Sequence, residues 1–133
     1  MKPRPLYLDS SALIKLVFEE RETPALEAFL VDRPLRVSSS LARVEVIRAV
    51  RSVSDALASR HAGEVLAAIE LIAPNAAVFA GAADVDPLSL RALDAIHLAT
   101  AVALLPDLDG MVVYDRRLAE AAREAGLTVW APA

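Results

Sequence analysis

The sequence of 133 residues contains no cysteine, which excludes disulfide bonds, thiolate metal sites and cysteine nucleophiles. Only two histidines are present, His61 and His97, so a metal ion would have to be held mainly by oxygen ligands. Glycine is also scarce, and none of the four glycines precedes a helix in a phosphate-binding or dinucleotide-binding pattern. Nucleotide cofactors are therefore not expected.

Long apolar runs are missing as well. The richest segment, ALDAIHLATAVALL, is interrupted by Asp94 and His97 and falls short of the ~18 apolar residues that a membrane span needs. The N-terminal segment MKPRPLYLD has basic residues but no apolar stretch of signal-peptide length. We expect a soluble protein of the cytoplasm.

The charge balance is mildly acidic, with a formal net charge of −4. This argues against a strongly basic nucleic-acid-binding domain, but not against an enzyme that touches a few phosphates through a metal ion and some arginines. With 56% hydrophobic and 24% charged residues, the chain can fill a core, and its length predicts a single domain over residues 1–133.

Short apolar strands alternate with helical patterns along the chain. Strands are expected at 5–9, 35–40, 110–115 and 127–132, and helices at 11–20, 23–32, 41–53, 56–72, 88–105 and 116–126. Ser10 or Ser11 is available as the N-cap of the first helix, and residues 75–86 are ambiguous. The alternation indicates βαβ units, a mainly parallel sheet and helices on both faces, which is a three-layer α/β/α sandwich.

Four carboxylates are expected at one edge of this sheet, where ligands bind outside the carboxyl ends of the strands. Asp9 and Asp115 end two strands, and Glu45 lies early in the helix that follows a third. Asp94 lies in the first half of the long helix, which the short connection PDLDG makes antiparallel to the next strand. These four residues can therefore converge.

Each acid also has an ordinary structural interpretation. Asp9 and Asp115 are suited to cap the helices that follow them. Glu45 can pair with Arg48, three residues later, on the surface of one helix. Asp94 is the least easily explained, because an ionised carboxylate among leucines costs several kcal/mol unless it is paired, for example with Arg91, or binds a cation.

The remaining polar residues do not favour a histidine metal site or a serine nucleophile. His97, among leucines, is expected to be a packed and hydrogen-bonded histidine rather than a ligand, and His61 is expected at the surface. Ser10 and Ser11 lack the G-x-S-x-G surroundings of a serine nucleophile and a histidine base. Oxygen ligands at a sheet edge favour Mg²⁺ or Mn²⁺, which can activate water and stabilise the charge of phosphodiester attack.

The segments YLDSSALIKLVFEE, LARVEVIRAV, LRALDAIHLATA and VVYDRRLAEAAREAGL, in this order, resemble the PIN-domain ribonucleases, and most of all the VapC-type toxins of type II toxin–antitoxin pairs. The resemblance runs from about residue 5 to the C-terminus. It implies a Rossmann-like sandwich with a five-stranded sheet and a Mg²⁺- or Mn²⁺-dependent endoribonuclease that cleaves RNA. It further implies a homodimer inhibited by a VapB-like antitoxin, and metal ligation by Asp9, Glu45, Asp94 and Asp115.

Some features leave the function open. Many relatives have threonine or serine where Val113 stands, so a polar group that helps to position a metal-bound water is missing. Contacts to phosphates, or to an acidic stretch of an antitoxin, are possible for Lys15, Arg43, Arg48, Arg91 and Arg116.

A non-catalytic adaptor, whose acidic pocket binds a partner's basic residues, is the main alternative function. A phosphotransferase that is phosphorylated on Asp9 is weaker, because neither lysine follows a late strand.

Overall fold

The protein, seen in a computed structural model that describes residues 2–133, is organised around a five-stranded sheet. The strands are β1 (Leu6–Leu8), β2 (Arg36–Ser39), β3 (Glu70–Ile72), β4 (Gly110–Val112) and β5 (Val129–Trp130). Their order is β3-β2-β1-β4-β5, and every pairing is parallel. The strand order reverses between β1 and β4, so the carboxyl ends of these two strands flank the position where ligands bind in such sheets.

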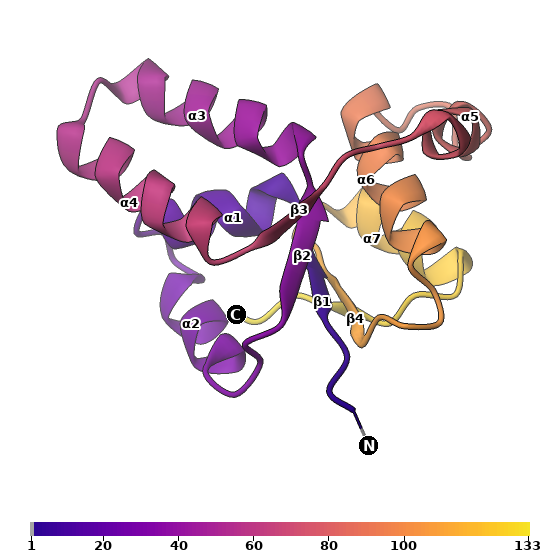
Figure 1. Cartoon of the computed structure of the whole chain (residues 1–133), viewed down its shortest axis with the longest axis horizontal. Coiled ribbons are helices and arrows are strands. Elements are labelled where there is room, and N and C mark those ends of the chain that lie inside the picture. Colours follow the sequence, from indigo (N-terminus) through magenta and orange to yellow (C-terminus); the bar gives the residue numbers. More distant parts are fainter. Residues whose placement is uncertain (1) are drawn as a thin grey trace.

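Within the described residues 2–133, seven helices form the two outer layers. They are α1 (Ser10–Val17), α2 (Thr23–Leu30), α3 (Leu41–Val53), α4 (Ala56–Ala67), α5 (Ala76–Ala83), α6 (Ala92–Ala103) and α7 (Arg116–Glu124). Helices α1 to α4 lie on one side of the sheet, and α5 to α7 on the other (Figure 1). The predicted three-layer α/β/α sandwich with a five-stranded sheet is thereby confirmed.

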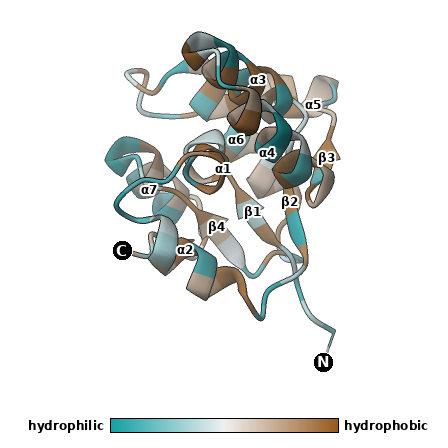
Figure 2. Ribbon diagram, turned by 90° about the vertical axis from the view of Figure 1, so that its left-hand side faces the viewer, coloured by the Kyte–Doolittle hydropathy of each residue, from teal (hydrophilic) through white to brown (hydrophobic). Residues whose placement is uncertain are grey.

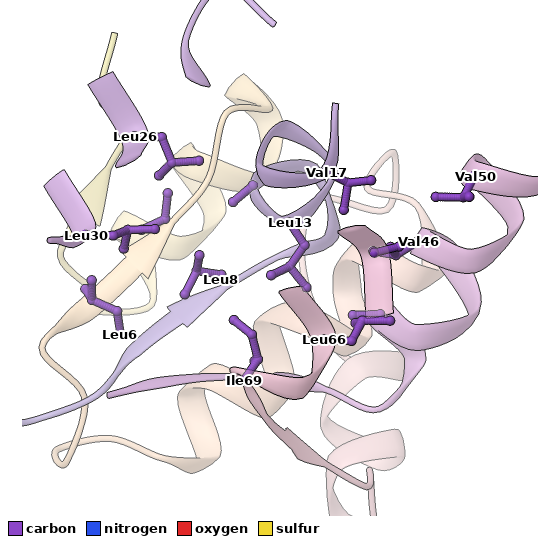
Figure 3. Close-up of a cluster of buried hydrophobic side chains, with 14 of the residues drawn as sticks. Leu6, Leu8, Leu13, Val17, Leu26, Leu30, Val46, Val50, Leu66 and Ile69 are labelled. Atoms are coloured by element: carbon purple, nitrogen blue, oxygen red, sulfur yellow. The ribbon is translucent and has the colours of Figure 1, made fainter. Parts of the chain in front are cut away.

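The central strand β1 supplies both cores through the alternation of its side chains. Leu6 and Leu8 are buried against Leu13, Leu30 and other residues of α1 to α4 (Figure 3). Tyr7 points to the opposite face, into the core built by α6 and α7. Helices α4 and α7 carry many hydrophilic residues, which are coloured teal in Figure 2.

Three predicted elements differ from the structure. The helix expected over 56–72 ends at Ala67, and Glu70–Ile72 instead pairs in parallel with Val37–Ser39 of β2. The apolar pattern of 65–72 fits a helix or a strand, and only the distant pairing with β2 decides between them. The ambiguous segment contains helix α5, capped by the Asn75 side chain.

The long helix expected from residue 88 begins only at Ala92, because Arg91 has an extended backbone. Asp94 therefore lies in the first turn of α6. Asp9 and the two serines were all candidate caps of α1, and in the structure Asp9 is the N-cap. Across the described residues no helix has the length and apolar character needed to cross a membrane.

Candidate metal site at the carboxyl edge of the sheet

Asp9 stands where β1 ends and α1 begins, and its side chain is almost fully buried, with 2% exposed. Its Oδ1 accepts hydrogen bonds from the Ala12 amide at 3.1 Å and from the Ser11 hydroxyl at 2.6 Å. Burial raises the pKa of Asp9 to about 6, although these hydrogen bonds oppose the shift. Asp9 is thus a helix cap and also a carboxyl group that ionises reluctantly without a cation.

Glu45, on α3, is held by residues of two other helices. Its Oε1 lies 2.8 Å from His97 Nε2, and its Oε2 accepts a hydrogen bond from the Ser10 hydroxyl at 2.9 Å. Burial raises the pKa of Glu45, but the hydrogen bonds from His97 and Ser10 outweigh it and leave the pKa below its usual value. The surface pair with Arg48 considered above is replaced by these contacts.

His97 links Glu45 to the core of the protein. Its ring is fully buried, and its Nδ1 lies 2.6 Å from the hydroxyl of the buried Tyr7. Because an ionised carboxylate can only accept, Nε2 donates to Glu45, and in a neutral imidazole Nδ1 then accepts from Tyr7. His97 is therefore the packed and hydrogen-bonded histidine that the sequence predicted, but its partners Tyr7 and Glu45 were not foreseen.

Asp94 and Asp115 approach the same place from the other side of the sheet. Asp94, in the first turn of α6, is half-buried, and burial followed by repulsion from Asp115 and Glu45 raises its pKa despite the nearby His97 and Arg91. Asp115 is exposed and caps α7, where its Oδ1 accepts from the Leu118 amide at 2.9 Å. Asp115 is thus close enough to Asp94 to contribute to the raised pKa of Asp94.

All four predicted acids line one pocket of about 380 Å³ at the carboxyl edge of the sheet, where Ser10 and Arg91 also line it. Oxygen donors that repel one another are the ligands that a hard divalent cation requires, so the residues present fit Mg²⁺ or Mn²⁺. Within residues 2–133, however, no three histidine or acidic side chains stand close enough to form an ion cage. Binding an ion therefore requires side chains to turn toward it.

Val113 does not line this pocket. Its side chain is buried in the core with Tyr7 and Leu118, on the α6 and α7 face of the sheet, while its amide donates to the carbonyl of Trp130. A hydroxyl at this position would be placed in that apolar core, where it costs free energy unless it finds a partner. Valine at 113 is therefore explained by packing.

The basic residues considered as phosphate contacts differ in their distance from the acidic pocket and in their partners. Lys15 forms ion pairs with Glu20 and Glu22 at 3.1 and 3.2 Å, and its side chain is largely buried. Arg43 and Arg48 are exposed on α3 and line neither the acidic pocket nor the pocket beside it. Arg91 and Arg116 lie at the pockets themselves, and Arg117, which was not singled out from the sequence, lies with them.

Comparison with known proteins agrees with this geometry. The model of the PIN domain family matches residues 6–125. The chain belongs to the PIN-domain family. It is 44% identical over 128 residues to Ribonuclease VapC46 of Mycobacterium tuberculosis, covering 96% of this chain and 97% of that protein. It is 42% identical over 132 residues to Ribonuclease VapC35 of the same species, covering 96% of both chains.

Two solved structures share the fold. The crystal structure of Mycobacterium tuberculosis VapC20, described as a sarcin-ricin loop cleaving toxin, has a TM-score of 0.70 at 14% identity and covers 92% of this chain and 96% of that one. A toxin–antitoxin complex from Klebsiella pneumoniae has a TM-score of 0.64 at 22% identity and covers 83% of this chain and 86% of that one. At these identities the likeness concerns the arrangement of helices and strands.

Proposed function

We propose that this PIN-domain protein is a metal-dependent endoribonuclease and acts, as a single domain in the cytoplasm, as the toxin of a VapBC-type pair. The observation that carries the proposal is that Asp9, Glu45, Asp94 and Asp115, which come from four separate segments, line one pocket at the strand-order reversal. The relatives named as VapC ribonucleases, which match nearly the whole chain, support cleavage over the alternative of a non-catalytic adaptor.

The four carboxylates are the proposed ligands of Mg²⁺ or Mn²⁺, which when bound lowers the pKa of a water molecule and stabilises charge on a phosphate. The protein's own contribution is to hold two of these four carboxylates, Glu45 and Asp9, in place. His97 and Ser10 fix the two oxygens of Glu45, and the start of α1 fixes Asp9. Asp94 contributes a half-buried carboxyl group with a raised pKa, which can accept a proton or turn toward the cation.

Removal of the metal tests this function. Purified protein incubated with total cellular RNA is expected to yield discrete fragments with Mn²⁺ or Mg²⁺ and none with a chelator. Asp94→Asn is expected to lower the cleavage rate by at least about 100-fold, because the neutral amide is a poor ligand for a hard cation. Gel analysis of the RNA measures both effects.

The matched control is Asp84→Asn, which removes the same charge from an exposed position at the end of α5. It is expected to cleave at the wild-type rate. Cleavage that survives the chelator would contradict the metal-dependent mechanism, and full activity of Asp94→Asn would remove this residue from the site. Binding of Mn²⁺ without cleavage of any RNA would favour the adaptor alternative.

A homodimer and a VapB-like antitoxin are the partners that we propose. Large apolar side chains remain exposed on the α5 and α6 side of the molecule, with Phe79 at 49% and Val102 at 39% exposure, which is typical of a surface that is covered in an assembly. Light scattering of the purified protein is expected to give twice the mass of 14.2 kDa. A monomer at all concentrations would contradict the homodimer.

A further inference from the structure

A second pocket, of about 620 Å³, adjoins the acidic one, and three arginines are among the residues that line it. Arg91, Arg116 and Arg117 line it together with Ser89, and it shares Arg91, Asp94 and Asp115 with the acidic pocket. The two pockets are therefore parts of one depression along the carboxyl edge of the sheet. We propose that this arginine pocket binds a phosphate of the RNA strand next to the bond that is cleaved, an inference that rests on the proposed function.

The charges of these arginines are available to a ligand. All three side chains belong to exposed residues, and within residues 2–133 none of the three takes part in an ion pair. Such a group is unexpected in a protein of net charge −4, which has fewer basic than acidic residues overall. Its position beside the acids is therefore a local feature that an anionic substrate can use.

The start of α7 strengthens the positive potential of this pocket. Arg116 and Arg117 are the first two residues of the helix, where amide groups without helical partners point outward. Asp115 accepts a hydrogen bond from the Leu118 amide, whereas the amides of Arg116 and Arg117, the first two in the helix, have no acceptor within it. Guanidinium groups beside a helix N-terminus favour phosphate, which accepts several hydrogen bonds at once.

A phosphodiester strand fits this arrangement better than an acidic peptide. A strand can place one phosphate at the arginines while the neighbouring phosphate lies at the acids with their cation. A glutamate-rich segment that follows the same depression would instead bring carboxylates against Asp94 and Asp115, which line the same pocket. We therefore assign the pocket to RNA.

The test compares two double variants of equal charge. Arg116→Gln with Arg117→Gln removes the pocket's arginines on α7, and Arg51→Gln with Arg123→Gln removes exposed arginines from the last turns of α3 and α7. Steady-state cleavage of a short single-stranded RNA in Mn²⁺ gives KM and kcat. Fluorescence anisotropy of the same RNA, in chelator and over a range of salt concentrations, gives the affinity without cleavage.

The pocket variant is expected to raise KM by about tenfold with a much smaller change in kcat, because these two arginines hold the strand and not the reacting atoms. Its plot of log affinity against log salt is expected to be shallower by about 0.7, because one phosphate of the single strand is no longer neutralised. The control variant is expected to match the wild type in both measurements.

The outcomes separate this inference from the proposed function. Wild-type KM and salt dependence in the pocket variant would overturn the inference while leaving the nuclease intact. If the wild-type protein binds RNA but never cuts it, and the pocket variant binds RNA more weakly, the result would support the pocket and contradict the nuclease. Loss of binding to a polyglutamate peptide, with unchanged RNA affinity, would overturn the inference in favour of an acidic protein partner.

Discussion

Asp9→Asn is expected to abolish RNA cleavage and, at pH 7 without metal, to make the protein more stable than the wild type. Activity is lost because the amide removes one negative charge from the proposed cation site. The cap of α1 survives, because asparagine is as good an N-cap as aspartate and its carbonyl oxygen can still accept from the Ala12 amide. A cleavage assay in Mn²⁺ measures the first effect and urea unfolding in chelator the second.

The gain in stability follows from the pKa of Asp9. Burial raises this pKa to about 6, whereas in the unfolded chain it lies near 3.9. Because the folded pKa is the higher one, the stabilisation from the neutral carboxyl is complete below pH ~4 and is lost as the pH rises through about 6. A shift of roughly two pKa units corresponds to about 3 kcal/mol at pH 7, and the asparagine variant avoids this loss.

Two comparisons check the explanation. The difference in unfolding free energy between Asp9→Asn and the wild type is expected to disappear near pH 4, and to shrink at pH 7 when Mn²⁺ stabilises the wild type alone. Asp55→Asn alters the exposed aspartate that caps α4 and is expected to change stability by less than about 0.5 kcal/mol at either pH. A pH-independent difference would show that burial of Asp9 is not the cause.

Much of this site could be predicted from the sequence, because the acids lie at positions that the fold class brings together. Asp9 and Asp115 directly follow apolar strands, and parallel strands end at the same edge of a sheet. The predicted bounds of α3 agree with the structure, so Glu45 was correctly placed one turn after the start of this helix. These inferences need only local patterns and the rule that the chain alternates between strand and helix.

Other features depend on contacts between distant residues. Glu45 has a plausible partner on its own helix in Arg48, but its actual partner is His97, which is 52 positions away. Strand β3 exists because of its pairing with β2, and the late start of α6 gives Asp94 its place in the first turn. Tyr7 contacts His97 because its side chain lies on the α6 and α7 face of β1. All three residues of β1 are buried, so the sequence does not show which face each side chain occupies.

His97→Ala is expected to lower both the stability of the protein and its affinity for the metal ion. The substitution leaves the buried hydroxyl of Tyr7 without its partner and creates a cavity at a fully buried position. Together these changes are expected to lower the unfolding free energy by about 2–4 kcal/mol. Urea unfolding at constant pH in the presence of chelator measures this loss.

The effect on metal binding distinguishes a positioning residue from a merely structural one. Without the bond from Nε2, one oxygen of Glu45 is free to turn away, so the affinity for Mn²⁺ is expected to fall roughly 10- to 100-fold. His97→Gln can place an amide nitrogen near the position of Nε2 and is expected to restore most of the affinity. Tyr7→Phe keeps the contact between His97 and Glu45, so it is expected to lose stability with little change in affinity.

Titration of Mn²⁺ followed by electron paramagnetic resonance reads the affinity of each folded variant without any cleavage assay. The order expected is wild type and Tyr7→Phe tightest, then His97→Gln, then His97→Ala. Equal affinities across the series would mean that Glu45 does not need His97 to bind the ion, and that the hydrogen-bonded chain from Tyr7 to Glu45 serves packing alone. Because Ser10 holds the other oxygen of Glu45, Ser10→Ala combined with His97→Gln is expected to lose the affinity that glutamine alone retains.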